Sequence, residues 1–166
     1  MIVGIDYWPS KADCSEVLKR AGHDASQNVW RGLTPLRSTR SEVERLLGVQ
    51  KDSVGKTFIY ETATETVHVS YSEGTCKESG NGRWNVPSAT VLQIRVYPRE
   101  TILVRDLRVD LSRYQRRPDP IIPNWAFYSN DEDGMMIQTK LEDGREQVVI
   151  MTYGPTERDA QLRCRN

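Results

Sequence analysis

An alternation of apolar and polar residues at period two constrains this chain most. Residues 66–71 read TVHVSY and residues 90–98 read TVLQIRVYP. Successive side chains of a strand point to opposite faces of a sheet, so each segment presents one apolar and one polar face. Similar patterns predict strands over 58–60, 125–129, 135–141 and 146–153. The sequences NDEDG and EDG predict hairpin turns between the last three, because both end in glycine.

Helix signals stand beside these strands. Thr39 and Glu42 form a Thr-x-x-Glu capping box, and Gly48 supplies a stop. The residues between them give an apolar face spaced i, i+3 and i+4, made of Val43, Leu46 and Leu47. Two further helices are predicted over residues 11–21 and over residues 103–114, where leucines recur every four positions.

These elements predict an α+β fold, with short helices packed on one face of a mostly antiparallel β-sheet. Residues 1–29 are expected to form an N-terminal extension with a short helix, and residues 30–166 a single α+β domain. Both halves of that domain read helix, strand, strand, strand. Two similar halves, 30–98 and 99–166, are therefore an open alternative.

Composition excludes several classes of function. The 166 residues carry 23 basic and 23 acidic side chains, so no overall field attracts the chain to nucleic acid. No apolar run approaches the roughly 20 residues of a membrane-spanning helix. The three cysteines form no CxxC or Cys/His spacing, and neither a metal site nor a cofactor is predicted.

The cysteines leave two alternatives open. Cys76 lies in a glycine-rich loop and Cys164 in the C-terminal tail, which makes them the candidate disulfide pair, while Cys14 has no evident partner. Three free thiols in a reducing compartment are the other interpretation.

No catalytic residue is predicted. His68 and Cys76 lie near the end of one strand, but no third group is evident that would orient a nucleophile–base pair. The run Asp131–Glu132–Asp133–Gly134 resembles part of a calcium loop, although strands flank it where an EF-hand has helices. A hairpin turn is the favoured interpretation.

Aromatic and basic residues beside loops and prolines form a candidate protein interface. Its members are Trp8, Trp84, Trp125, Tyr128, Arg113, Arg116 and Arg117. Such residues are enriched where proteins contact one another. The alternative is that the aromatic rings cap the core and the arginines are solvated.

Two resemblances bear on these expectations. The stretch GLTPLRSTRSEVERLLGVQ resembles the helix entry of BamE/SmpA-like lipoproteins and β-lactamase-inhibitor-like domains, which implies a helical hairpin on an antiparallel sheet and a role in binding proteins. The blocks WRGLTPLRSTRSEVERLLG, VSYSEGTC, WNVP, PDP and YGPTERDAQLRC resemble an uncharacterised, commonly exported family of bacterial proteins. This second resemblance favours the Cys76–Cys164 bridge and a periplasmic or secreted location.

The sequence therefore predicts a non-catalytic, extracytoplasmic module that binds a protein partner or assembles with itself. The alternative is a hydrolase that acts on an envelope or extracellular polymer through carboxylates the sequence does not single out. Two buried acids with raised pKa values in one pocket would favour that enzyme.

Overall fold

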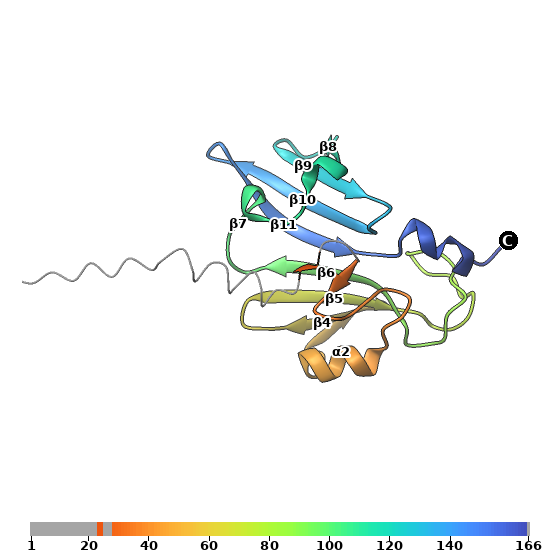
Figure 1. The fold of residues 1–166 in the computed structure, drawn as a ribbon. Helices are drawn as coiled ribbons and strands as arrows, with labels where there is room; N and C mark the ends of the chain where they lie inside the picture. The colour runs from red at the N-terminus through yellow and green to blue at the C-terminus, as the bar shows by residue number, and fades with distance from the viewer. Residues whose placement is uncertain (1–22, 25–27, 166) are drawn as a thin grey trace, which may run out of the picture.

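One long antiparallel sheet dominates the computed structural model, which describes residues 23–24 and 28–165 (Figure 1). Its strands are β3 (Asp52–Val54), β4 (Thr57–Glu61), β5 (Glu65–Tyr71), β6 (Val91–Pro98), β7 (Ile102–Leu103), β8 (Gln115–Pro118), β9 (Trp125–Asn130), β10 (Met135–Glu142) and β11 (Arg145–Tyr153). Their spatial order is β3-β4-β5-β6-β11-β10-β9-β8, with β7 paired to β11. Outside this sheet lie β1 (His23–Asp24), β2 (Val29–Trp30), α2 (Arg40–Leu47), and the 3-10 helices η1 (Val104–Asp106), η2 (Leu111–Arg113) and η3 (Glu157–Leu162).

The predicted α+β class is wrong, because the fold is mostly antiparallel β. All six predicted strands are present, but α2 is the single α-helix within the described residues. Irregular segments and 3-10 turns cover the sheet where helices were expected. They do so because buried side chains such as Trp30, Val104 and Tyr114 cover apolar surface of the sheet without helical periodicity.

The helix predicted over residues 103–114 is also wrong. Leu103 ends β7 and pairs with β11, and two separate 3-10 turns follow. The Asp110 carboxylate accepts hydrogen bonds from the backbone N–H and the hydroxyl of Ser112, a local bond that competes with helix. Leu107 and Leu111 still pack against the core, so their spacing correctly indicated residues that are partly buried but did not indicate a helix.

The capping box of α2 is confirmed. The Glu42 N–H donates to the Thr39 hydroxyl, and the Glu42 carboxylate accepts from the Thr39 N–H at 2.7 Å. Val43 is fully buried and Leu47 packs against the core, but Leu46 is 45% exposed. The helix lies at the lower margin of the sheet in Figure 1. The sheet therefore covers only part of the predicted apolar face of the helix, and Leu46 lies outside the covered part.

The strands of the two halves lie side by side in one continuous sheet. Strands β3 to β6 and strands β8 to β11 meet where β6 pairs with β11, with Val96 opposite Met151 (Figure 1). Among the described residues the second half contains no α-helix, so the predicted repeat of helix, strand, strand, strand is wrong.

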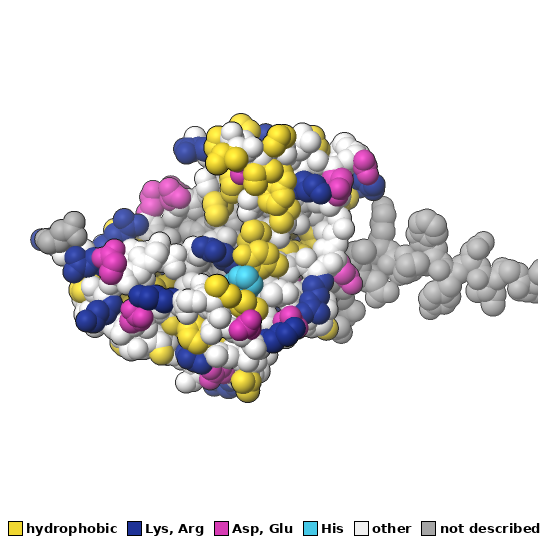
Figure 2. Space-filling model, turned by 180° about the vertical axis from the view of Figure 1, so that it is seen from behind, with side chains coloured by type: hydrophobic (Ala, Val, Ile, Leu, Met, Phe, Trp, Pro, Cys, Tyr) yellow, Lys and Arg dark blue, Asp and Glu magenta, His cyan; other side chains and the backbone are white. Residues whose placement is uncertain are grey.

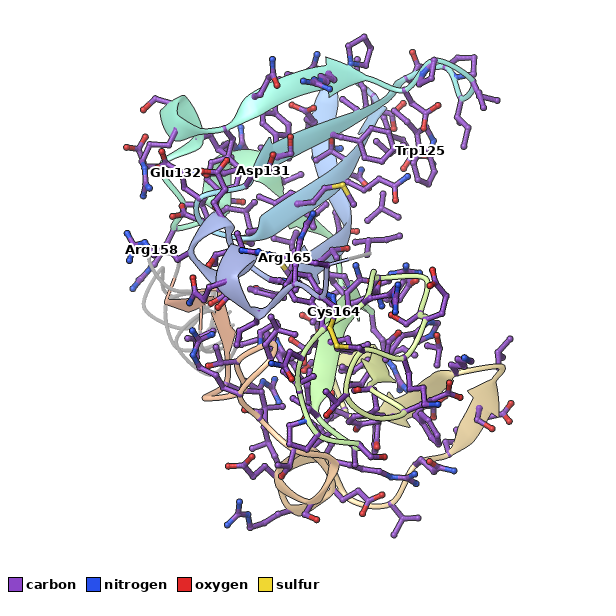
Figure 3. The ribbon with its side chains drawn as sticks, turned by 90° about the vertical axis from the view of Figure 1, so that its right-hand side faces the viewer. Trp125, Asp131, Glu132, Arg158, Cys164 and Arg165 are labelled. Carbon is purple, nitrogen blue, oxygen red and sulfur yellow. A yellow bond between two sulfur atoms is a disulfide. The ribbon has the colours of Figure 1, made fainter. Side chains whose placement is uncertain are left out.

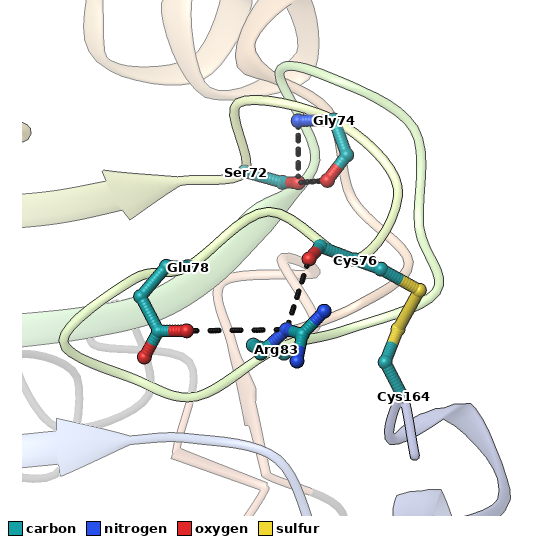
Figure 4. The surroundings of a disulfide bond; sticks show 6 residues. All are labelled: Ser72, Gly74, Cys76, Glu78, Arg83 and Cys164. Carbon is teal, nitrogen blue, oxygen red and sulfur yellow. Dashed lines mark hydrogen bonds and ion pairs between the residues drawn. A yellow bond between two sulfur atoms is a disulfide. The ribbon is translucent and has the colours of Figure 1, made fainter. Parts of the chain in front are cut away.

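A disulfide between Cys76 and Cys164 joins the loop after β5 to the C-terminal tail (Figure 4). Beside it, Trp84 forms a β-bridge with Arg163, and the Arg83 Nε donates to the Cys76 carbonyl at 3.2 Å. A second, smaller hydrophobic cluster lies beside the disulfide and contains Leu36, Trp84, Val86 and Leu92. The tail is therefore tied to the first half of the chain.

The helix predicted over residues 11–21, Trp8 and Cys14 lie outside the described residues. Within the proposed extension 1–29, β1 pairs with β2, and the Asn28 amide donates to the Gly154 carbonyl at 2.8 Å.

Candidate functional site

The two faces of the sheet differ in what lies against them. The core face, which carries Tyr60, Val67 and Ile94, packs against β2, α2 and the residues around η1 and η2. On the opposite face, here called the open face, side chains along β5, β6 and β9 remain partly or fully exposed. Within the described residues, these side chains are therefore at least partly in contact with solvent.

Strand pairing arranges the open face in rows that run across the strands. One row passes through Ile59, His68, Arg95, Thr152 and Met136. The register brings Gln138 opposite Ile150 and Phe127, and Phe127 opposite Arg117. Continuing the β6–β11 register by one residue puts Tyr97 level with Ile150 and extends this second row.

Half of the side chains in these two rows are apolar or aromatic. We call the apolar band the set Ile59, His68, Tyr97, Ile150, Met136, Phe127 and Trp125. Each is partly buried except Met136, which is exposed. Figure 2 shows this face, with hydrophobic side chains running from beside the histidine upward across the second half of the sheet. Large aromatic and aliphatic side chains gathered on one exposed face are typical of binding surfaces.

His68 behaves as a member of this band. Its ring lies 4.5 Å from the ring of Tyr97, centroid to centroid. Burial, and then the neighbouring Arg95 charge, lower the pKa of His68 below its usual value of about 6.5, so the ring is neutral at neutral pH. Cys76 is in a disulfide and holds no thiol, so these two residues form no nucleophile–base pair.

Cations flank the apolar band. Arg95 on β6, Lys140 on β10 and Arg117 on β8 all face the open side. Lys140 pairs with Glu142 at 2.9 Å, whereas neither Arg95 nor Arg117 forms an ion pair with a described carboxylate. Among the described strands, the carboxylates on this face are Glu142 on β10, Glu61 on β4 and Asp52 on β3, and Glu61 pairs with Lys51 and Arg99. The charge is therefore mixed at β3 and β4 and mainly positive from β6 to β8.

A polar cluster occupies the core side of the second half. The Glu146 carboxylate accepts from the Tyr128 hydroxyl at 2.8 Å, from the Thr139 hydroxyl at 2.9 Å, and from Arg116 at 3.3 Å. Burial acts to raise the pKa of Glu146, but these donors outweigh it and lower the pKa. Glu146 borders a hollow of about 330 Å³ beside Leu103 and Leu111. A satisfied, ionised carboxylate of this kind stabilises the fold and is not suited to donate a proton.

Glu65 is the carboxyl with a raised pKa among those described. Burial raises this pKa, while the charge of Arg31, with Nη2 2.8 Å from Oε2, opposes the shift. Every other shifted carboxyl in the described chain has a lowered pKa: Glu42, Glu61, Asp110, Glu142, Glu146 and Asp159. The described residues thus provide no two carboxyl groups with raised pKa values in one pocket, which is the arrangement that would have favoured a hydrolase.

The sheet separates the residues predicted to share an interface. Trp125 and Arg117 face the open side, whereas Tyr128 and Arg116 face the core side and join Glu146. Figure 3 shows Trp125 at one end of β9, far from Asp131 and Glu132 at the other. One predicted set therefore divides between two faces.

Arg113 and Trp84 belong to neither face. Arg113 pairs with Asp133 at 3.0 Å in the turn before β10, which is the predicted hairpin turn. Trp84 is 3% exposed and its indole N–H donates to the Asn81 carbonyl, so its side chain lies in the interior and not on an exposed face. Its ring packs under Arg163 in the smaller hydrophobic cluster. This placement agrees with the alternative interpretation, in which the aromatic rings cap the core.

The described residues offer neither a metal centre nor a membrane-spanning helix. No cluster of three or more His, Cys, Asp or Glu side chains there could hold a metal ion. None of the described helices has both the length and the apolar character to cross a membrane.

Sequence reasoning missed most of the apolar band, although one signal could have found it. In WAFYSN the residues Trp125 and Phe127 share one phase, and in VVIM apolar residues occupy both phases. Alternate residues of a strand point to opposite faces of the sheet. If the core covers one face only, a strand with apolar residues at both alternating sets of positions must present one of those sets on the other face. Arg95 and Lys140 sit on the same phase as that set.

Comparisons with known proteins inform the fold. No protein-family model matches the chain, and no curated protein sequence matches it. Among solved structures, the chain is similar to YjgB, a DUF4309 family protein from Bacillus subtilis subsp. subtilis str. 168. The superposition has a TM-score of 0.53 and 15% sequence identity, and covers 86% of this chain and 97% of that chain. This likeness concerns the fold alone.

Proposed function

We propose that the chain is a non-catalytic protein-binding module that engages its partner through the open face of the sheet. The observation that carries this proposal is the apolar band, which extends from Ile59 on β4 to Phe127 on β9 and whose side chains are at least partly in contact with solvent. Monomeric proteins rarely expose contiguous apolar surface of this kind unless it binds something.

An extracytoplasmic location is part of the proposal. The disulfide between Cys76 and Cys164 supports it, because stable disulfides are rare in reducing compartments.

The test compares two double variants, each of which replaces two apolar side chains with hydroxyl-bearing ones. Phe127→Ser with Ile150→Thr removes the centre of the band, whereas Leu46→Ser with Val49→Ser removes exposed apolar side chains on and after α2. Each protein is used to capture partners from a cell-envelope extract, and captured proteins are quantified by mass spectrometry. A captured protein is then purified, and its dissociation constant for each variant is measured by calorimetry.

We expect one partner to bind the wild type and the α2 variant equally, and to bind the band variant at least about tenfold more weakly, or about 1.4 kcal/mol. Thermal unfolding of both variants must stay close to the wild type. The proposal is wrong if the band variant binds every purified partner with unchanged affinity.

A further inference from the structure

We propose that the partner presents an extended, acidic segment with interspersed apolar residues to the open face. This inference rests on the proposed function and adds the chemistry of what is bound. It follows from the sign and the spacing of the charges around the apolar band.

From β5 to β8 in the sheet order, the charges on this face that have no ion-pair partner are positive. The carboxylates Glu142 on β10 and Glu61 on β4 also face the open side, but Glu142 pairs with Lys140, and Glu61 pairs with Lys51 and Arg99. Arg95 and Arg117 bond to the neutral side chains of Gln93 and Gln115, which leaves their charges uncompensated by a described acid. An acidic partner would supply the missing charges.

Their separation suits an extended chain. Arg95 and Arg117 stand on β6 and β8, four strand spacings apart in the sheet order, and their registers differ by one row. Neighbouring strands lie about 4.8 Å apart, so the two arginines are roughly 20 Å apart across the sheet. An extended chain rises about 3.3 Å per residue and its alternate side chains face the same side, so carboxylates at i and i+6 would match this interval.

A second copy of the chain fits this face less well. A closed dimer sets the same patch against itself, so the uncompensated positive charge of Arg95 and Arg117 would meet the same uncompensated charge on the second copy. Like charges set against each other disfavour such a pairing.

A lipid surface also fits less well. Membrane-surface elements insert apolar side chains about 5–10 Å deep. In the apolar band, Ile59, Tyr97, Ile150 and Phe127 are partly buried between neighbours on the pleated surface, which suits contact with another chain.

The test uses three synthetic peptides and the intact, oxidised protein. The acidic probe is acetyl-Glu-Val-Phe-Glu-Val-Phe-Glu-amide, and its controls carry Gln or Lys in place of each Glu. Binding is measured by fluorescence anisotropy. The protein variants are Arg95→Glu with Arg117→Glu, and a control with Arg45→Glu and Arg158→Glu, two exposed cations on α2 and η3.

We expect the acidic peptide to bind at least tenfold more tightly than the Gln peptide, and its binding to weaken with added salt. The Arg95/Arg117 variant should lose this binding and gain binding to the Lys peptide, whereas the Arg45/Arg158 control should match the wild type.

Other results overturn the inference in distinguishable ways. If the Gln peptide binds as tightly as the acidic one, and Phe127→Ser with Ile150→Thr abolishes both, the face binds proteins without preference for acid. If the two band substitutions change nothing for any probe, the proposed function also fails. If vesicles of 70% phosphatidylcholine and 30% phosphatidylserine bind and displace the acidic peptide, a lipid surface is the better partner.

Discussion

At the scale of single residues, buried charge is placed where the chain can neutralise it. Asp159 is fully buried, and its carboxylate accepts from the Thr156 N–H at 2.8 Å, from the Thr156 hydroxyl at 2.9 Å, and from Arg37 at 2.8 Å. Burial acts to raise the pKa of Asp159, but these donors outweigh it and lower the pKa. This one carboxylate both begins η3 and ties it to the first half of the chain.

We therefore expect Asp159→Asn to reduce the free energy of unfolding by about 2–4 kcal/mol at pH 7. A carboxyl with a lowered folded-state pKa stabilises the fold above its unfolded pKa of about 3.9, and this contribution is lost as the pH falls through the folded pKa. Urea unfolding at pH 7 and pH 3 should show a difference between wild type and variant that shrinks at pH 3.

Glu157→Gln, at an exposed position in η3, is the matched control and should change stability little at either pH. A difference for Asp159→Asn that is equally large at pH 3 would show that shape, and not the ionised carboxylate, is what matters.

At the scale of secondary-structure elements, α2 illustrates how short helices are held by few contacts. Eight residues cannot form a stable helix alone, so its caps and its buried side chains must compensate. Val43 is buried, and the Arg40 guanidinium lies 4.4 Å from the centroid of the Phe58 ring at the end nearest β4.

Val43→Ala should cost about 2–3 kcal/mol, because two buried methyl groups are lost and the site cannot fully collapse. Leu46→Ala should cost less than about 1 kcal/mol, because that side chain is already largely in water. Chemical unfolding of both variants checks the order, and a larger loss for Leu46→Ala would contradict the placement of the helix.

At the scale of the whole molecule, the disulfide joins two segments that are far apart in the sequence. Cys76 and Cys164 are 88 residues apart, and between them run β6 to β11 and η3. Constraining a loop of that length in the unfolded chain stabilises the fold by about 4–5 kcal/mol in the chain-entropy treatment.

We expect Cys76→Ser with Cys164→Ser to lower the urea midpoint by an amount equivalent to about 4–5 kcal/mol. Dithiothreitol should lower the midpoint of the wild type to a similar extent and should not change that of the double variant. Equal midpoints for oxidised and reduced wild type would show that the bridge does not constrain the unfolded chain.

The sequence alone determined the local elements of this protein. Period-two alternation located the strands that became β4, β5, β6, β9, β10 and β11, and the Thr39–Glu42 pair located the start of α2. The turn ending at Gly134 was equally local, because its φ of +60° is a conformation that glycine adopts without strain. These features depend on residues close in sequence, whose preferences survive in any fold.

The tertiary structure alone decided what covers each face. The spacing of the leucines in 103–114 also fits a helix. In the structure Leu103 pairs with β11 as part of β7, and Leu107 and Leu111 pack against the core from a segment of 3-10 turns. Arg116 and Arg117 are adjacent in sequence, yet the register of β8 against β9 sends one to the Glu146 cluster and the other to the open face. Which apolar phase is buried depends on distant segments such as Trp30 and Val43, and alternation carries no information about them. The apolar band is the phase that those segments left uncovered.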